Sequence, residues 1–430
     1  MKLVLSFYGK EKMFCYSPWI YLQVLQNGQL SPCCFANPGL VYDQNQKEIT
    51  LADFPKTEEI LNSKTYKDLR KSMMNNEFPA ACGFCQTIEI SNGQSPRKAL
   101  LDGLTKYIDQ NELLLNTQPD GELRNPKVKY LELKLDNICN LKCRICGPHY
   151  SSSWQFDASQ ILANGFNIEN NQKFSTEKNH STQLSNSKQF IDWVNSKSDS
   201  LLNLQITGGE PFLSPNNEII IDQLIEKGYS SRINLIFTSN GTIFPFQLLR
   251  KFKMFKGVNI FLSIDGINKR FEYQRWPAKW TEVNENVLRW AAEIGNSVAK
   301  VTLQPTISIY NIACIHELLE WYIEKPATLE WPKHLNYVAS PSYLSPTIIN
   351  EFHKKKIQTN IQNLRMIYLN YQHPQQNRIV SWIDSIENLL NSNNDASKFD
   401  EFIKFNSMLD KIRKISYTDY LDPLTCNIIG

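Results

Sequence analysis

Ten cysteines constrain this chain more than any other feature, because eight of them lie within the first 146 of its 430 residues. The apolar stretch at the N-terminus is shorter than the core of a signal peptide, so we expect a cytoplasmic protein whose thiols stay reduced. Grouped thiols in such a chain are typical of metal or iron–sulfur cluster binding rather than of disulfides.

The rest of the composition is typical of a soluble globular protein. Hydrophobic residues make up 42% of the chain and charged residues 21%, which excludes a wholly disordered chain, collagen and a coiled coil. The formal net charge is only +3, so the charge balance does not call for a nucleic acid as partner. No apolar run approaches the roughly 20 residues of a membrane span, and we expect no membrane partner.

Short apolar strands alternate with helical stretches in the middle of the chain. We expect these strands at 128–135, 201–207, 233–238, 258–264, 301–308 and 335–339. The alternation predicts an α/β fold with a parallel sheet, and six such units predict a partial (β/α)6 TIM-like barrel. We expect a cysteine-rich α+β domain at 1–126, the partial barrel at 127–340 and a helical C-terminal region at 341–430. A polar stretch at 165–188 predicts a surface insertion.

The sharpest motif follows the first of these strands directly. It is the CxxxCxxC sequence that contains Cys139, Cys143 and Cys146. A 4Fe–4S cluster has four irons, so a set of three cysteines leaves one iron open to bind a reacting molecule. A zinc site with His149 as the fourth ligand is the alternative interpretation.

Polar motifs recur at the ends of the later strands. Gly208–Pro211, with the sequence GGEP, follows the second strand, Asn240 follows the third, and Ser263 and Asp265 end the fourth. Adjacent glycines let a backbone approach a ligand closely. Because active sites of βα folds lie at the C-terminal ends of the strands, these polar groups suit a ligand with a ribose and an amino-acid moiety.

This combination resembles the radical S-adenosylmethionine (SAM) superfamily over about 128–340. The resemblance implies that the three cysteines hold a 4Fe–4S cluster whose open iron chelates the amino and carboxylate groups of SAM. One electron would then cleave SAM to methionine and a 5′-deoxyadenosyl radical, which abstracts a hydrogen from an unreactive C–H bond. The implied SAM-binding residues are Ile145 beside the adenine, Gly208, Gly209 and Glu210 with the adjoining Pro211 at the methionine amino group, and Asn240, Ser263 and Asp265 at the ribose or methionine.

A second cysteine group precedes this region. Its members are Cys15, Cys33, Cys82 and Cys85. A hairpin signal at Asn27-Gly28 would fold Cys15 and Cys33 toward each other. The pattern C-x12-G-x4-C resembles the auxiliary-cluster modules called SPASM and twitch, which usually follow the radical SAM domain, and implies one auxiliary 4Fe–4S cluster. Cys34 makes the second ligand ambiguous, although the spacing favours Cys33, and a structural zinc site is the alternative.

Two further cysteines are candidate hydrogen-atom donors to a substrate radical. Cys314 begins a helix after the fifth strand, where a helix N-terminus lowers the pKa of a thiol. Cys426 lies on the C-terminal tail. The alternative for both is an ordinary small, buried side chain.

We therefore expect a radical SAM enzyme with two 4Fe–4S clusters. Auxiliary-cluster members of this superfamily include many that cross-link, epimerise or cut ribosomally made peptides, so a peptide is the expected substrate. A separate leader-peptide-binding protein and an external electron donor such as flavodoxin or ferredoxin are the expected partners. Dehydrogenation or rearrangement of a small metabolite or sugar is one alternative. A non-catalytic zinc-binding module is another, but it would have no use for the GGEP and SIDG segments.

Overall fold

The computed structural model describes residues 13–90, 95–168, 187–294, 299–326, 328–331, 335–391 and 396–429. The chain forms two compact units. The first contains Met1–Glu132 and Ser187–Leu202, and the second contains Leu133–Asn186 and Asn203–Gly430. Most of the insertion expected at 165–188 lies outside the described residues.

The first unit consists of short helices around a hairpin. Its helices are α1 (Ser17–Ile20), α2 (Thr57–Leu61), α3 (Lys64–Met74), α4 (Gly83–Ile90), α5 (Pro96–Leu104), α6 (Gln110–Leu115) and α9 (Lys188–Ser198). Strands β1 (Tyr21–Val24) and β2 (Leu30–Ser31) pair antiparallel, which confirms the predicted hairpin. Gly28 has a φ of +80°, a backbone conformation that favours glycine at such a turn.

A buried arginine holds this unit together. Arg70 of α3 is fully buried and donates hydrogen bonds to the carbonyl oxygens of Pro18, Leu61 and Gly121 at 2.5–2.6 Å. Burial lowers the pKa of Arg70 to about 9. Because the charge is shared among backbone carbonyls of three separate segments, one side chain joins parts of the chain that form little regular structure.

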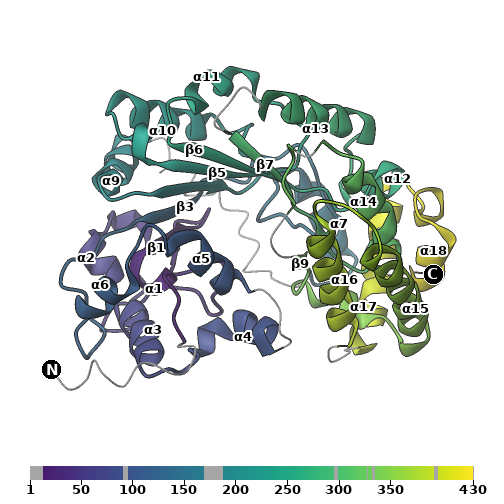
Figure 1. The fold of residues 1–430 in the computed structure, drawn as a ribbon, viewed down its shortest axis with the longest axis horizontal. Coiled ribbons are helices and arrows are strands. Elements are labelled where there is room, and N and C mark those ends of the chain that lie inside the picture. The colour runs from purple at the N-terminus through teal and green to yellow at the C-terminus, as the bar shows by residue number, and fades with distance from the viewer. Residues whose placement is uncertain are drawn as a thin grey trace. The chain divides into compact units, whose positions relative to one another are not determined.

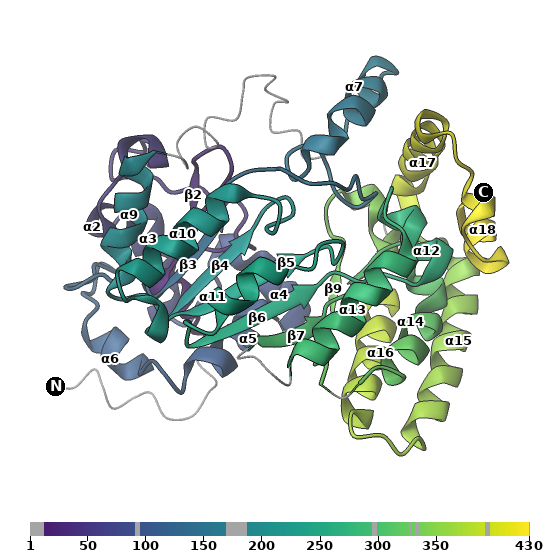
Figure 2. The ribbon, with the colours of Figure 1, turned by 90° about the horizontal axis from the view of Figure 1, so that it is seen from above.

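The second unit is built on a parallel sheet. Its strands are β4 (Asn203–Thr207), β5 (Asn234–Ser239), β6 (Gly257–Leu262) and β7 (Ala299–Leu303), which pair in this order. The register places Ile206, Phe237, Ile260 and Val301 in one row across the sheet, and all four are fully buried. Helices α10 (Pro215–Glu226), α11 (Leu249–Phe252) and α13 (Trp280–Ile294) lie along one face of the sheet (Figures 1 and 2). The predicted parallel α/β fold is confirmed.

The strand expected at 301–308 is interrupted. It divides into β7 and β8 (Thr306–Ile307), because Pro305 between them has no backbone N–H to donate to a ladder. The last expected strand shortens to β9 (Asn336–Tyr337), which pairs parallel with β8 in a separate two-stranded sheet.

Helices complete the second unit. They are α7 (Gln155–Ala163), α12 (Asn268–Gln274), α14 (Ile315–Ile323), α15 (Glu351–Leu369), α16 (Gln376–Asn391), α17 (Phe399–Arg413) and α18 (Pro423–Ile429). The C-terminal region is helical, as predicted, and α15 and α16 lie side by side (Figures 1 and 2). Among the described residues, no helix combines the length and apolar character needed to cross a bilayer.

Candidate active site and auxiliary cysteine site

The CxxxCxxC segment forms a loop after β3 (Tyr130–Lys134). Its backbone pairs with the segment that follows α12, where the Lys142 N–H donates to Trp276 O at 2.7 Å and the Arg144 N–H to Gln274 O at 2.8 Å. The Trp154 indole N–H donates to the Cys143 carbonyl at 2.9 Å. The loop is therefore fixed by hydrogen bonds to the segment after α12 and to Trp154.

The three thiols of this loop are free and close enough to influence one another. The Leu141 N–H approaches Cys139 Sγ at 3.4 Å. Burial raises the pKa of Cys143 to about 11, and it raises that of Cys146 above its ordinary range, with Cys143 adding to the effect. A metal ligand must be a thiolate, so these groups need a nearby positive charge, which the iron ions of a cluster would supply.

Gly208 and Gly209 let the end of β4 lie against the segment that leads into the cysteine loop. Gly208 has a φ of +123°, and a Cβ atom there would lie 2.7 Å from Asp136 O. A Cβ atom on Gly209 would lie 2.1 Å from Ile138 O, too close for any side chain. The two glycines thus have a structural reason besides the ligand approach that the sequence suggested.

Glu210 is buried and all its described partners are in the protein. Its carboxylate accepts from the Ser239 hydroxyl at 2.9 Å and from the Asn240 N–H at 2.7 Å. Burial raises the pKa of Glu210 to about 7, and these hydrogen bonds oppose the rise. Glu210 therefore joins the ends of β4 and β5. Pro211 is also buried, and its carbonyl accepts from the Asn217 amide at 2.9 Å.

The other implied SAM-binding residues lie on the cysteine loop or at the ends of β5 and β6. The Asn240 amide donates to Asn140 Oδ1 at 3.0 Å and approaches Cys139 Sγ at 3.8 Å. Ser263 is half-buried, and its N–H donates to Ser239 O at 2.9 Å. Ile145 is also half-buried. The ends of β4, β5 and β6 thus converge with this loop, as the motif order predicted.

Asp265 contacts an arginine that the sequence reasoning missed. Arg275 lies directly after α12, and its Nη2 is 2.6 Å from Asp265 Oδ2. Its Nη1 lies 3.9 Å from Cys143 Sγ. Asp265 also accepts from the Thr306 N–H at 2.8 Å, and both charged groups are buried. The nearness of Arg275 to the SIDG segment in sequence was the one signal that could have found it.

Helix α17 supports the cysteine loop from the C-terminal region. Arg144, between two of the cysteines, is fully buried and forms an ion pair with Asp410 and a hydrogen bond to Asn406 Oδ1 at 2.7 Å. Arg413, at the end of α17, donates to Lys142 O at 2.6 Å and pairs with Asp157 Oδ2 at 2.8 Å. No sequence motif indicated these contacts, because the partners are more than 250 residues apart.

The second cysteine group lies wholly in the first unit. Cys15 and Cys85 are buried, and Cys33 and Cys82 are half-buried. Burial raises the pKa of Cys15 to about 12, and the neighbouring thiols of Cys82 and Cys85 raise it further, whereas Arg97 opposes the rise. Mutual influence of this kind places these three thiols near one another although they come from distant segments.

The position of Cys33 and Cys34 follows from the loop that they begin. Asn37 donates its N–H to Ala81 O at 3.1 Å, and the ring of Phe35 stacks on that of Phe84 at 5.0 Å. The loop is thereby held against the CxxC segment. Cys33 Sγ accepts from the Phe35 N–H at 3.4 Å, whereas Cys34 is exposed.

The CxxxCxxC loop and the group of Cys15, Cys82 and Cys85 fit an iron–sulfur cluster. Burial raises the pKa of Cys85, and of the two candidates for the fourth auxiliary ligand it is Cys34 that adds to this rise. Within the described residues, no three His, Cys, Asp or Glu side chains are arranged to hold one metal ion. A 4Fe–4S cluster binds each cysteine through a different iron, so its ligands do not have to meet at one point as those of zinc do. A further sign at the CxxxCxxC loop is the buried Nε of Arg275, which has no hydrogen-bond partner among the described residues. A sulfur-rich anion beside Cys143 would complete its surroundings.

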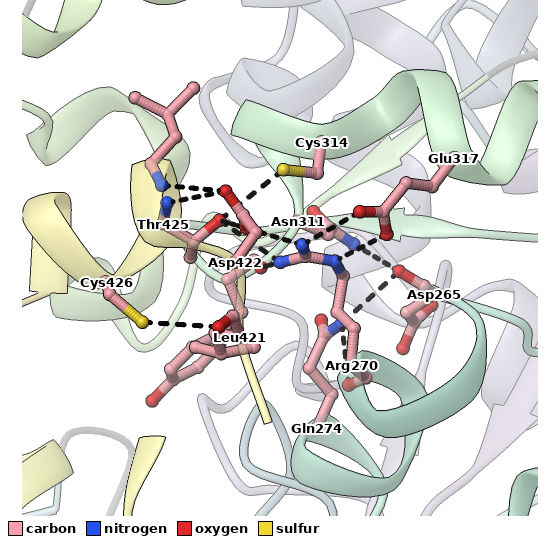
Figure 3. Close-up of polar contacts among 12 residues, drawn as sticks. Asp265, Arg270, Gln274, Asn311, Cys314, Glu317, Leu421, Asp422, Thr425 and Cys426 are labelled. Carbon is pink, nitrogen blue, oxygen red and sulfur yellow. Dashed lines mark hydrogen bonds and ion pairs between the residues drawn. The ribbon is translucent and has the colours of Figure 1, made fainter. Parts of the chain in front are cut away.

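The two candidate hydrogen donors lie near a buried arginine of α12 (Figure 3). Arg270 pairs with Asp422 at 2.5 Å and Glu317 at 3.1 Å. Cys314 is buried, with its Sγ 3.6 Å from Thr425 Oγ1, and burial raises its pKa to about 12. The pKa-lowering effect expected of a helix N-terminus is thus outweighed. Cys426 Sγ lies 3.4 Å from Leu421 O.

The family comparisons agree with this geometry. The family model described as the radical SAM superfamily matches residues 134–322, and the SPASM model, described as an iron-sulfur cluster-binding domain, matches residues 15–86. The radical SAM match thus covers residues 134–322, and the match to the cluster-binding domain precedes it. This is the order that the sequence predicted. The two domains imply SAM and iron–sulfur clusters as cofactors and an enzyme as the class of protein.

Similarity to individual proteins is more distant. No curated protein matches the chain. Among solved structures, anSMEcpe with bound AdoMet and the Cp18Cys peptide is 14% identical, with a TM-score of 0.36, and the match covers 57% of this chain and 62% of that one. Streptococcus suis SuiB bound to its precursor peptide SuiA is 14% identical, with a TM-score of 0.34, covering 82% of this chain and 70% of that one. The match to anSMEcpe thus spans less than two thirds of its length.

Proposed function

We propose that this protein reductively cleaves SAM and uses the resulting radical to abstract a hydrogen atom from a substrate, most favourably a ribosomally made peptide. The observation that carries the proposal is the group of free thiols on one loop, fixed by the backbone after α12 and surrounded by the polar ends of β4, β5 and β6. When bound, the cluster would supply the electron that cleaves SAM.

The chain's own residues have separate parts in this proposal. Cys139, Cys143 and Cys146 would hold the cluster. Ile145, the glycines of the GGEP segment and the polar groups at the strand ends would orient SAM, with Glu210 fixing β5 through Ser239. Glu210 and Asp265 are themselves buried from solvent.

A peptide substrate is supported by the cluster-binding domain at 15–86, because auxiliary-cluster domains accompany many peptide-modifying members of the superfamily. Cys15, Cys33, Cys82 and Cys85 would hold one auxiliary 4Fe–4S cluster. The proposal includes an external electron donor such as flavodoxin or ferredoxin and a separate protein that binds the leader peptide. Chemistry on a small metabolite or sugar is the alternative.

The test is hydrogen transfer measured by isotope. The anaerobically reconstituted enzyme is incubated with SAM, dithionite and deuterated peptides encoded beside its gene. Deuterium in 5′-deoxyadenosine together with a changed peptide mass is the expected result. Cleavage of SAM with no deuterium transfer from any peptide, but transfer from a deuterated small metabolite, would contradict the peptide assignment. Absence of SAM cleavage would contradict the whole proposal.

A further inference from the structure

Arg275 differs from the other cationic side chains around the cysteine loop. Lys142 and Arg413 are both paired with Asp157, and Arg144 is paired with Asp410. The pairs of Lys142 and Arg144 join the loop to α7 and α17, and the pair of Arg413 joins α17 to α7. Arg275 is also paired with a carboxylate, that of Asp265, but its guanidinium lies 3.9 Å from Cys143 Sγ. Against the effect of burial, its charge lowers the pKa of Cys143 more than that of Arg413 does.

The hydrogen bonds of Arg275 are incomplete among the described residues. The residue is 7% exposed, and its Nε, like Nη1 of Arg413, is buried without a hydrogen-bond partner among the described residues. A buried donor without a partner costs free energy, and native proteins rarely leave one unsatisfied without a reason. Asp265 occupies one edge of the guanidinium through Nη2, and Cys143 lies beside Nη1. The arginine is thus shared between a carboxylate and a cysteine expected to bind the cluster.

We propose that Arg275 is a positioning residue that raises the reduction potential of the cluster at Cys139, Cys143 and Cys146. The inference rests on the proposed function and deepens it by assigning a cation to that cluster. A 4Fe–4S cluster with thiolate ligands is anionic and gains a further negative charge when it accepts the electron needed for SAM cleavage. A fixed cation beside a cysteine sulfur stabilises the reduced form more than the oxidised form, and burial strengthens the effect.

Loss of the Asp265 charge should shift the cluster potential in the direction opposite to loss of the Arg275 charge. The carboxylate of Asp265 partly neutralises Arg275, and it is itself a negative charge near the same cysteine. Loss of the arginine charge should therefore lower the cluster potential, whereas loss of the aspartate charge should raise it. A purely structural ion pair would give no such opposite shifts.

The experiment is an EPR-monitored redox titration of the reconstituted full-length enzyme without SAM, comparing the wild type, Arg275→Gln, Arg275→Lys and Asp265→Asn. A spectrum of each reduced protein with SAM added identifies the signal that responds to SAM. Arg275→Gln should lower the equilibrium constant for reduction of the SAM-responsive cluster about tenfold. For one electron this is a fall of about 59 mV in the reduction potential. Arg275→Lys should remain near the wild type. Asp265→Asn should shift the potential upward, and the auxiliary-cluster signal should not move in any variant.

Each outcome has a distinct meaning. An unchanged potential in a loaded Arg275→Gln variant, with the SAM response retained, would overturn the role of Arg275 and leave the proposed function intact. A wild type without any SAM-responsive signal would instead contradict the proposed function. If Arg275→Gln does not load a cluster, Asp265→Asn decides alone, because an upward shift supports the proposal and an unchanged potential overturns it.

Discussion

The two cysteine groups of this protein are built in different ways. The thiols of Cys139, Cys143 and Cys146 lie on one loop, whereas the auxiliary group gathers its thiols from three distant segments of the first unit. Each group nevertheless has a partly or fully buried arginine–carboxylate pair nearby, Arg275 with Asp265 and Arg97 with Glu89. The comparison teaches that a short motif can define the ligands of a site, whereas the charges around them are supplied by the fold.

The carboxylates near the two groups also differ. Burial raises the pKa of Glu89, but hydrogen bonds from Arg97 and Ser95 outweigh it and leave the pKa below its ordinary value. At the other site burial dominates and raises the pKa of Glu210 to about 7. The acid beside the CxxxCxxC loop is therefore one whose ionisation is costly, whereas the acid beside the second cysteine group is one whose ionisation is favoured.

The largest effect is expected from Cys143→Ala. Loss of a central ligand should remove the SAM-binding cluster, so formation of 5′-deoxyadenosine should fall to the background level while the far-ultraviolet circular dichroism stays that of the wild type. Cys426→Ala, which removes a thiol outside both cysteine groups, is the matched control and should keep SAM cleavage. Robust 5′-deoxyadenosine formation by Cys143→Ala would exclude this loop as the cluster site.

The second change, Cys82→Ala, separates the two sites. It should remove about half of the iron and abolish product formation, while uncoupled cleavage of SAM persists because that cluster lies on a different loop. Iron analysis, 5′-deoxyadenosine and modified product are measured on the same preparation. Unchanged product yield would make the auxiliary site dispensable.

A third change tests whether α17 supports the loop. Asp410→Ala leaves the fully buried Arg144 without its carboxylate, and we expect a loss of about 3–5 kcal/mol in the free energy of unfolding. Iron bound at the SAM site should fall in parallel. Asp384→Ala is the control, because its pair with Arg365 is about two fifths exposed, is screened by solvent and should contribute much less. Equal effects of the two variants would contradict the support role.

The smallest effect is a pH dependence at Glu210. Its pKa is raised from 4.5 to about 7 in the folded protein, so its contribution to stability is full below pH 4.5 and is lost as the pH rises toward 7. The loss should be roughly 3 kcal/mol at most. Anaerobic urea unfolding across this range should show the decline in the wild type and not in Glu210→Gln. The same slope in both proteins would assign it to other groups.

The sequence predicted the parts of the site that are local in the chain. The CxxxCxxC loop, GGEP and SIDG could be recognised because each motif is short and follows a strand, and the parallel sheet then brings them together. The hairpin at Asn27-Gly28 was predictable for the same reason. The interruption at Pro305 could have been anticipated from its missing N–H.

The remaining features depend on tertiary packing. Arg144 stands between two recognised cysteines, but its partners on α17 follow only from the folded chain. The proximity of Arg275 to Cys143 likewise follows only from the folded chain. The expected thiolate character of Cys314 depended on a helix N-terminus, whereas burial against Thr425 acts in the opposite direction.

The central claim is that the chain holds two iron–sulfur clusters, only one of which binds SAM. The most direct measurement is iron and sulfide content with an EPR spectrum of the reduced, anaerobically reconstituted protein, recorded with and without SAM. About eight irons per chain and two signals, of which SAM perturbs one, are the predicted result. Zinc in place of iron, with no effect of SAM on any signal, would contradict the account.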